Sequence, residues 1–147
     1  MGNRVVLDTN ILLKVVNKES GYASVVKILD QVDKGNINAF LSAVTIAEVA
    51  VGYYLSGDKA GLKDFLLHIR SHNKYSVVEV DMELGELAGK IRASTGLRLP
   101  DAIIAASGMI SEANWVITED THFKQASSFV SPITPDEFVN MNRCETS

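Results

Sequence analysis

Cysteine and proline are scarce in this sequence, which has one cysteine, Cys144, and three prolines among 147 residues. A single cysteine cannot form an internal disulfide, so the fold depends on its apolar core, and a reducing compartment is expected. Long hydrophobic runs are also missing. None approaches the roughly 18 residues that span a bilayer, and the first residues lack the apolar core of a secretory signal. We therefore expect a cytoplasmic protein without a membrane segment.

An excess of positive charge is absent as well. The formal net charge is −4 and the isoelectric point is about 5.3, which argues against a protein that coats nucleic acid through bulk positive charge. A local nucleic-acid site stays compatible with this balance, because clustered acids lower the net charge by themselves. The 46% hydrophobic and 22% charged residues indicate one globular domain. We expect it over residues 1–142, followed by a flexible tail at 143–147.

Short apolar runs alternate along the chain with segments whose apolar residues recur at helical spacing. Strands are predicted at residues 4–7, 37–41, 76–80, 115–117 and 130–133. Helices are predicted at residues 8–16, 22–34, 42–55, 61–73, 82–95 and 100–113. Thr134 and Glu137 form a capping-box pattern before a further helix. This alternation predicts an α/β fold, with a mostly parallel central sheet of four or five strands flanked by helices.

Four carboxylates lie at or near the predicted junctions between strands and helices. Asp8 and Asp120 follow the apolar runs of two strands. Asp101 opens the helix before residue 115, and Glu48 lies one to two turns into the helix after the second strand. Ligands of open α/β sheets collect outside the carboxyl ends of the strands, so the fold can bring these acids to one edge.

Each acid also has a local structural explanation. Asp8 can cap the helix that follows it, and Asp120 can form an Asx turn. Asp101 suits the first turn of a helix, and Thr45 with Glu48 matches a capping box. Acids gathered at one edge repel one another, since two charges about 4 Å apart repel by roughly 4 kcal/mol at an effective dielectric constant of about 20. Their conjunction therefore favours a shared function that offsets this repulsion.

A divalent cation would relieve this repulsion. Carboxylates and hydroxyls suit Mg²⁺ or Mn²⁺, whereas zinc prefers His and Cys. His68 and His72 have the i, i+4 spacing of a possible metal pair, but the sequence shows no third ligand in register, so we interpret them as a surface pair. His122 lies near Asp120 in the sequence and is assigned no role.

Four motifs give the chain a resemblance to a known family. They are Val6-Leu7-Asp8-Thr9-Asn10, Thr45-Ile46-Ala47-Glu48-Val49 with Gly52, Leu99-Pro100-Asp101-Ala102-Ile103-Ile104-Ala105-Ala106, and Val116-Ile117-Thr118-Glu119-Asp120-Thr121-His122-Phe123. In this order they resemble the PIN-domain ribonucleases, and among them the VapC-type toxins of bacterial and archaeal toxin–antitoxin pairs. The resemblance spans nearly the whole chain.

The resemblance implies a site, a reaction and partners. The implied catalytic residues, which are also the implied ligands of Mg²⁺ or alternatively Mn²⁺, are Asp8, Glu48, Asp101 and Asp120. The side chains implied to support these carboxylates by hydrogen bonds are Thr9, Asn10 and Thr118. The implied reaction is endonucleolytic hydrolysis of RNA that leaves a 3′-hydroxyl and a 5′-phosphate. The implied partners are a small antitoxin protein and a second copy of the chain in a homodimer.

Several assignments stay open at this point. Glu119 departs from the family pattern, which leaves the number of metal ions undecided. Basic residues near the acids are either RNA contacts or solubilising surface charges, namely Lys14, Lys18, Arg92 and Arg98. A haloacid dehalogenase-type enzyme needs a second acid where Asn10 stands, and a receiver domain needs paired acids near the first strand. The remaining alternatives are an RNA-processing PIN nuclease without an antitoxin and a non-catalytic PIN module that binds RNA or protein.

Overall fold

Each strand of this chain is followed by one or two helices. The computed structural model describes residues 3–146, and the side chains of residues 3–142. The strands are β1 (Arg4–Leu7), β2 (Asn38–Ser42), β3 (Tyr75–Val78), β4 (Trp115–Ile117) and β5 (Pro132–Ile133). The helices are α1 (Thr9–Val16), α2 (Tyr22–Asp33), α3 (Ala43–Leu55), α4 (Lys59–Ser71), α5 (Met82–Thr95), α6 (Leu99–Ile110), the 3₁₀ helix η1 (Thr121–Ala126) and α7 (Pro135–Thr146).

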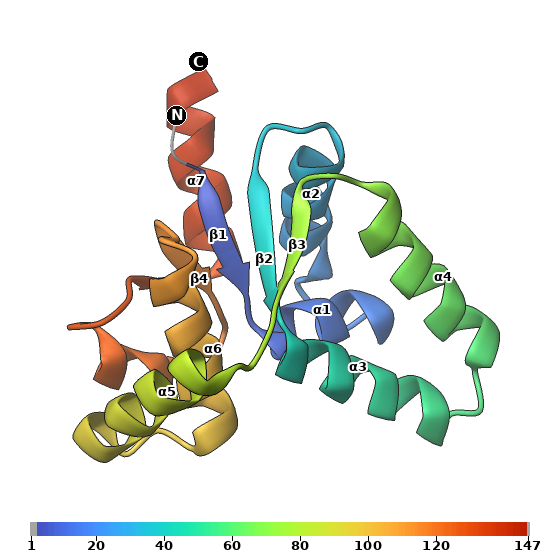
Figure 1. Cartoon of the computed structure of the whole chain (residues 1–147). Coiled ribbons are helices and arrows are strands. Elements are labelled where there is room, and N and C mark those ends of the chain that lie inside the picture. Colours follow the sequence, from blue (N-terminus) through green and yellow to red (C-terminus); the bar gives the residue numbers. More distant parts are fainter. Residues whose placement is uncertain (1–2, 147) are drawn as a thin grey trace.

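The strands form one five-stranded sheet in the order β3-β2-β1-β4-β5, and all neighbouring pairs are parallel. The chain adds β2 and β3 on one side of β1 and then returns to add β4 and β5 on the other side (Figure 1). Central strands of parallel sheets are covered on both faces, which explains the unbroken apolar run of β1. The expected α/β fold with a parallel sheet flanked by helices is confirmed.

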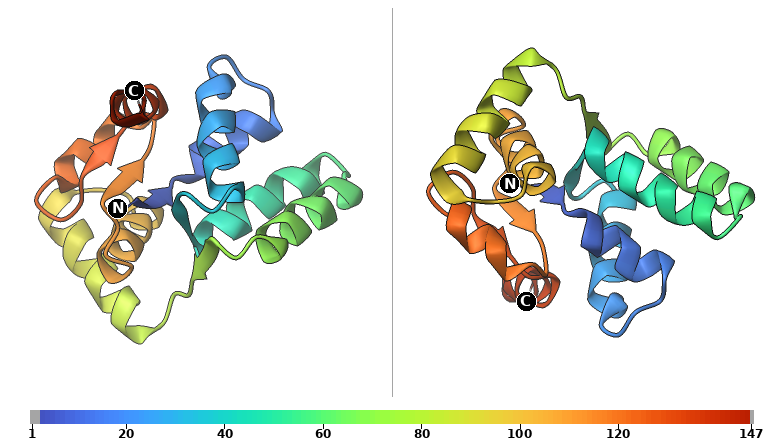
Figure 2. Two further views of the ribbon diagram at one scale, coloured as in Figure 1. Left: turned by 90° about the horizontal axis from the view of Figure 1, so that it is seen from above. Right: turned by 90° about the horizontal axis from the view of Figure 1, so that it is seen from below.

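The central strand β1 contributes to two apolar clusters, one on each face of the sheet. Val5 and Leu7 lie in a cluster with residues of α1, α2, β2 and α7. Val6 lies in a second cluster with residues of α5 and α6. Successive side chains of a strand point to opposite faces, so three consecutive buried residues tie both layers to one strand. Figure 2 shows the α5–α6 pair on one side of the molecule and the α3–α4 pair on the other.

The predicted elements are confirmed within a few residues, and the end of α6 differs for a physical reason. This helix ends at Ile110 instead of continuing to residue 113. Glu112 takes a φ of +54°, and Ala113 N donates to Gly108 O at 2.9 Å. Such a left-handed turn satisfies the last carbonyls of a helix and stops it.

The carboxyl-terminal third of the chain contains one element that the sequence patterns did not predict, the short helix η1. The capping box before α7 is confirmed, because Thr134 N donates to Glu137 Oε1 and Glu137 N donates to Thr134 Oγ1, both at 3.1 Å. The predicted domain boundary at residue 142 lies within α7, which continues to Thr146. Residue 147 of the expected tail lies outside the described residues. No helix of residues 3–146 is long and apolar enough to cross a membrane.

Two leucines provide a matched test of this packing. Leu84 is 0% exposed in the α5–α6 cluster, whereas Leu55, at the end of α3, is 84% exposed. Leu84→Ala should lower the free energy of unfolding by about 2–5 kcal/mol, because it removes buried methyl groups and leaves a cavity. Leu55→Ala should change it by less than about 0.5 kcal/mol. Urea unfolding measures both values, and equal effects would contradict the assignment of the core.

Candidate active site

The two central strands bring Asp8 and Thr118 side by side. Leu7 and Ile117 are register partners in β1 and β4, and Asp8 N donates to Ile117 O at 3.0 Å. The chain continues from β1 toward β2 on one side and from β4 toward β5 on the other. The topology of the sheet therefore switches between β1 and β4, which is where open α/β sheets bind their ligands.

Asp8 is held at this switch point by two hydrogen bonds and is only 4% exposed. Thr9 N donates to its Oδ1 at 2.8 Å, and Thr118 Oγ1 donates to its Oδ2 at 2.7 Å. Burial raises the pKa of Asp8 to about 6, against the two hydrogen bonds, and the charges of Asp101 and Asp120 add to the rise. Asp101 and Asp120 are therefore electrostatic neighbours of Asp8.

Asp101 reaches the same place from the first turn of α6, which begins with Pro100 inside that turn. It is 7% exposed, and its Oδ2 lies 3.1 Å from Arg98 Nε. The Arg98 side chain is 77% exposed. Its hydrogen bond to Asp101 raises its pKa, and the charges of Asp101, Asp120 and Glu48 add to this effect. The guanidinium group of Arg98 thus interacts electrostatically with three of the four acids.

Asp120 follows β4 and has both a local and a shared role. Its Oδ1 accepts a hydrogen bond from His122 N at 2.9 Å, and this bond caps η1. The same oxygen lies 2.8 Å from His122 Nδ1. Partial burial acts to raise the pKa of Asp120, but the bonds to His122 and the charges of His122 and Arg98 outweigh it and hold this pKa below its ordinary value. The expected Asx-type cap is therefore present in addition to the contact with the acidic site.

Glu48 joins the site through Thr9 and does not form the capping box that its spacing suggested. The cap of α3 is Ser42, whose Oγ accepts from Val44 N at 3.1 Å, so Thr45 lies inside the helix. Thr9 Oγ1 donates to Glu48 Oε1 at 2.9 Å. The capping-box alternative is wrong because α3 starts one turn earlier than that pattern assumed.

The sequence patterns did not predict the role of Thr45. Its hydroxyl is fully buried and lies 3.0 Å from Thr9 Oγ1. Since Thr9 Oγ1 donates its single proton to Glu48, the geometry makes Thr45 the donor to Thr9. The chain of hydroxyls links α3 to the start of α1. The available signal was a threonine on the same helical face as Glu48, three residues before it, in an otherwise apolar helix.

The other predicted site residues lie at the rim. Lys14 Nζ pairs with Glu119 Oε1 at 2.7 Å, so these two charges compensate each other. Asn10 Oδ1 accepts from Glu119 N at 3.4 Å and contacts none of the four carboxylates within hydrogen-bonding distance. Arg92 donates to Leu97 O at 2.5 Å. Lys18 is exposed just after α1, with a φ of +50°. Of the four basic candidates, Arg98 is the one that touches an acid of the site.

The four carboxylates are close but do not converge on one point. In the described part of the chain, the one group of three His, Cys, Asp or Glu ligand atoms within 4.8 Å of one another is Asp33, His68 and His72. The acids are therefore spaced more widely than this group, as the repulsion of like charges favours. Their oxygen ligands suit a hard divalent cation, which would draw the carboxylates together.

A family comparison distinguishes between the alternatives left by the sequence. The model of the PIN domain family matches residues 5–128, a range that contains all four acids. The chain belongs to the PIN domain family. The resemblance drawn from the four motifs is thereby confirmed, and because PIN domains are nucleases, membership supports a hydrolase. No match was found among curated proteins.

Solved structures of toxin–antitoxin complexes share this fold. A chain of VapBC2 from Rickettsia felis, bound to a DNA fragment from its promoter, has a TM-score of 0.71 at 20% identity, over 89% of this chain and 98% of that one. FitAcB from Neisseria gonorrhoeae has a TM-score of 0.65 at 25% identity, over 89% and 97%. A toxin–antitoxin complex from Klebsiella pneumoniae has a TM-score of 0.67 at 22% identity, over 89% and 97%.

Asp8→Asn tests the charge at the centre of the site. In metal-free protein the folded pKa of Asp8 is about 6 and its ordinary value is 3.8. The folded state therefore binds this proton more tightly, and the stabilisation is full below pH 4 and lost as the pH rises through 6. The two-unit difference corresponds to about 3 kcal/mol. Asn keeps the shape without the charge, so the variant should melt above the wild type at pH 7.

The measurement is thermal unfolding in EDTA between pH 4 and pH 7. The wild type should lose stability across this range relative to Asp8→Asn, and the two melting temperatures should converge toward pH 4. A variant that melts below the wild type at pH 7 would show that the Asp8 carboxylate stabilises the fold, contrary to its raised pKa.

Proposed function

We propose that this PIN domain is the ribonuclease toxin of a toxin–antitoxin pair, and that it hydrolyses RNA phosphodiester bonds with Mg²⁺ or Mn²⁺. The observation that carries the proposal is the position of Asp8 at the topological switch point, where burial and the charges of Asp101 and Asp120 raise its pKa. A buried acid such as Asp8 is expected in this place to serve chemistry, because its ionised form weakens the fold.

The residues at this site fit a hard divalent cation. Asp8, Asp101 and Asp120 supply carboxylate oxygens, Glu48 supplies a fourth, Arg98 pairs with Asp101, and His122 contacts Asp120. When bound, Mg²⁺ or Mn²⁺ activates a water molecule and neutralises the charge that grows on the phosphate. The protein neutralises only part of this acidic charge by itself, which is the electrostatic condition for binding the ion.

The side chains of the site have distinct roles in this proposal. Thr118 and Thr9 N fix the carboxylate of Asp8 by hydrogen bonds to both of its oxygens. Thr9 and the buried Thr45 hold Glu48, which is exposed and can accept a proton from the attacking water or orient it. No covalent nucleophile is required.

The substrate reaches the acids beside Arg98. A cavity of about 220 Å³ opens there, lined by Gly96, Leu97, Arg98, Asp101, His122 and Gln125. The exposed guanidinium of Arg98 can bind a phosphate next to the scissile bond, because planar guanidinium groups form paired hydrogen bonds with phosphate oxygens. Contacts of RNA with Lys14, Lys18 and Arg92 are part of the same proposal.

The similar complexes provide the basis for the partners. The similar solved structures include the toxin–antitoxin complex from Klebsiella pneumoniae and VapBC-1 from nontypeable Haemophilus influenzae, the latter with a TM-score of 0.69. We extend the antitoxin partner and a homodimer to this chain on that fold-level likeness. If a short reading frame adjoins the gene, co-expression with it, followed by purification of the complex, tests the antitoxin directly.

Asp101→Asn should abolish RNA cleavage. The substitution removes one negative ligand and leaves the side chain's shape, so we expect a loss of at least about 100-fold in single-turnover cleavage of RNA with Mg²⁺ or Mn²⁺. Asp64→Asn, on exposed α4, is the matched control and should retain activity. Circular dichroism checks that both variants are folded. Full activity in folded Asp101→Asn would exclude the assignment.

Divalent cations should raise the melting temperature of the wild type at pH 7. A ligand at 100 times its dissociation constant adds about 2.7 kcal/mol, which corresponds to roughly 5–10 °C for a domain of this size. The scan compares MgCl₂ and MnCl₂ with NaCl at equal ionic strength. Asp8→Asn and Asp101→Asn should lose most of the shift, and an undiminished shift in both variants would place the ion elsewhere.

A further inference from the structure

A second group of metal-ligating side chains lies at the opposite edge of the sheet. Asp33 ends α2, just before β2, whereas His68 and His72 lie at the end of α4, just before β3. The amino ends of the parallel strands meet at this edge, and the four acids of the active site lie at or beyond the carboxyl ends. The two groups are thus separated by the length of the strands (Figure 1).

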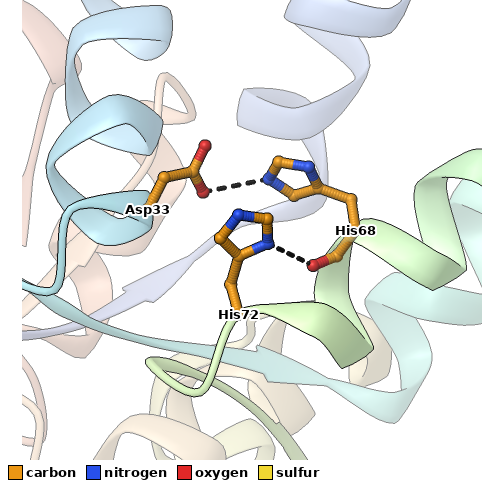
Figure 3. A group of neighbouring side chains, drawn as sticks. All are labelled: Asp33, His68 and His72. Carbon is orange, nitrogen blue, oxygen red and sulfur yellow. Dashed lines mark hydrogen bonds and ion pairs between the residues drawn. The ribbon is translucent and has the colours of Figure 1, made fainter.

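The three side chains of this second group face one another. One carboxylate oxygen of Asp33 and one ring nitrogen each of His68 and His72 lie within 4.8 Å of one another. Asp33 Oδ1 is 2.9 Å from His68 Nε2, and the two imidazole rings stack with centroids 4.2 Å apart. Figure 3 shows a nitrogen of each ring directed toward the Asp33 carboxylate. Two imidazoles and one carboxylate are a ligand set typical of zinc and related transition metals.

Surrounding groups hold these side chains in the orientation that a metal needs. His72 Nδ1 lies 2.8 Å from His68 O, so this nitrogen carries the proton and Nε2 keeps its lone pair. Tyr75 Oη donates to Asp33 Oδ1 at 3.0 Å. Histidine ligands commonly donate their other N–H to a carbonyl, and carboxylate ligands are themselves hydrogen-bonded. The Tyr75 residue is buried, and its ring packs edge-on against both imidazoles.

We propose that Asp33, His68 and His72 form a Zn²⁺ site that joins α2 to α4. Zinc bonds of about 2.0–2.1 Å to three tetrahedral ligands require ligand atoms about 3.3 Å apart. The contact of 2.9 Å between Asp33 and His68 opens by a few tenths of an ångström to meet that spacing. The ligand atoms all lie within 4.8 Å of one another, so any wider pair closes toward it when the ion binds. The fourth position is left to water or to a ligand from outside the chain.

The alternative is a hydrogen-bonded pair of helix histidines without a metal. An i, i+4 histidine pair can also bind a transition metal through two ligands only. The effect of Asp33 on zinc affinity therefore distinguishes the proposed three-ligand site from a histidine pair. The site is also independent of the proposed nuclease function, because it uses none of the residues at the acidic edge. Its failure and the failure of the nuclease proposal can therefore be observed separately.

The experiment is isothermal titration of EDTA-stripped, dialysed protein with ZnCl₂ at pH 7.5 in excess MgCl₂, which occupies the acidic edge. The wild type should bind one Zn²⁺ per chain, and Asp33→Asn, His68→Gln and His72→Gln should each weaken binding by at least about tenfold. The matched controls are His122→Gln, which removes the third histidine of the chain, and Asp101→Asn, which alters the acidic edge. Both should bind Zn²⁺ as the wild type does.

Two outcomes would overturn the proposal. Equal affinity of Asp33→Asn and the wild type would leave only a two-histidine contact, and loss of binding in Asp101→Asn but not in His68→Gln would place zinc at the acidic edge. If a variant fails to fold, histidine-ring NMR of the wild type decides instead. Zn²⁺ should shift Nε2 of His68 and His72 but not the nitrogens of His122. Mg²⁺-dependent RNA cleavage by His68→Gln should equal that of the wild type.

Discussion

The pairing of β1 with β4 is the constraint on which the rest of this structure depends. The register that sets Leu7 beside Ile117 also sets Asp8 beside Thr118, and the bond from Asp8 N to Ile117 O closes the ladder at the site itself. A shift of one residue would turn every side chain of β1 to the other face and move Asp8 away from Thr118. The two apolar clusters that bury Val5, Val6 and Leu7 prevent such a shift. Packing of the apolar clusters thus fixes the positions of Asp8 and Thr118, although no residue of these clusters takes part in the chemistry of the site.

The hydrogen bonds of the acids serve the fold and the site together. Asp8 caps α1 and Asp120 caps η1, as the local explanations of these residues predicted. The same contacts orient the carboxylates of Asp8 and Asp120, and the charges of Asp101 and Asp120 both act on Asp8. A structural and a functional reading of an acid at a strand end therefore do not exclude each other. A cap fixes the side chain's rotamer, and a fixed rotamer is what a metal ligand requires.

Sequence patterns predicted the strands, their parallel arrangement and the junction positions of the acids, because apolar runs and turn residues are local signals. They failed where two elements distant in the sequence meet. The spacing of Thr45 and Glu48 imitates a capping box, and only the start of α3 at Ala43 shows that both side chains turn toward Thr9. The third ligand beside His68 and His72 is Asp33, 35 residues before His68. No periodicity connects residues that belong to different helices, so only the structure shows the contact of Asp33 with the end of α4.

The distribution of charge explains why the acidic edge needs a rigid sheet beneath it. Ionised Asp8 alone costs the folded state about 3 kcal/mol, a large part of the 5–15 kcal/mol by which domains are usually stable. The ionised acids lie just after the carboxyl ends of β1 and β4, whereas the stabilising apolar contacts lie along the strands and under the helices. The site can therefore keep uncompensated charge without losing its geometry. If a divalent cation binds as proposed, it relieves the repulsion between the carboxylates, so binding the ion also stabilises the fold.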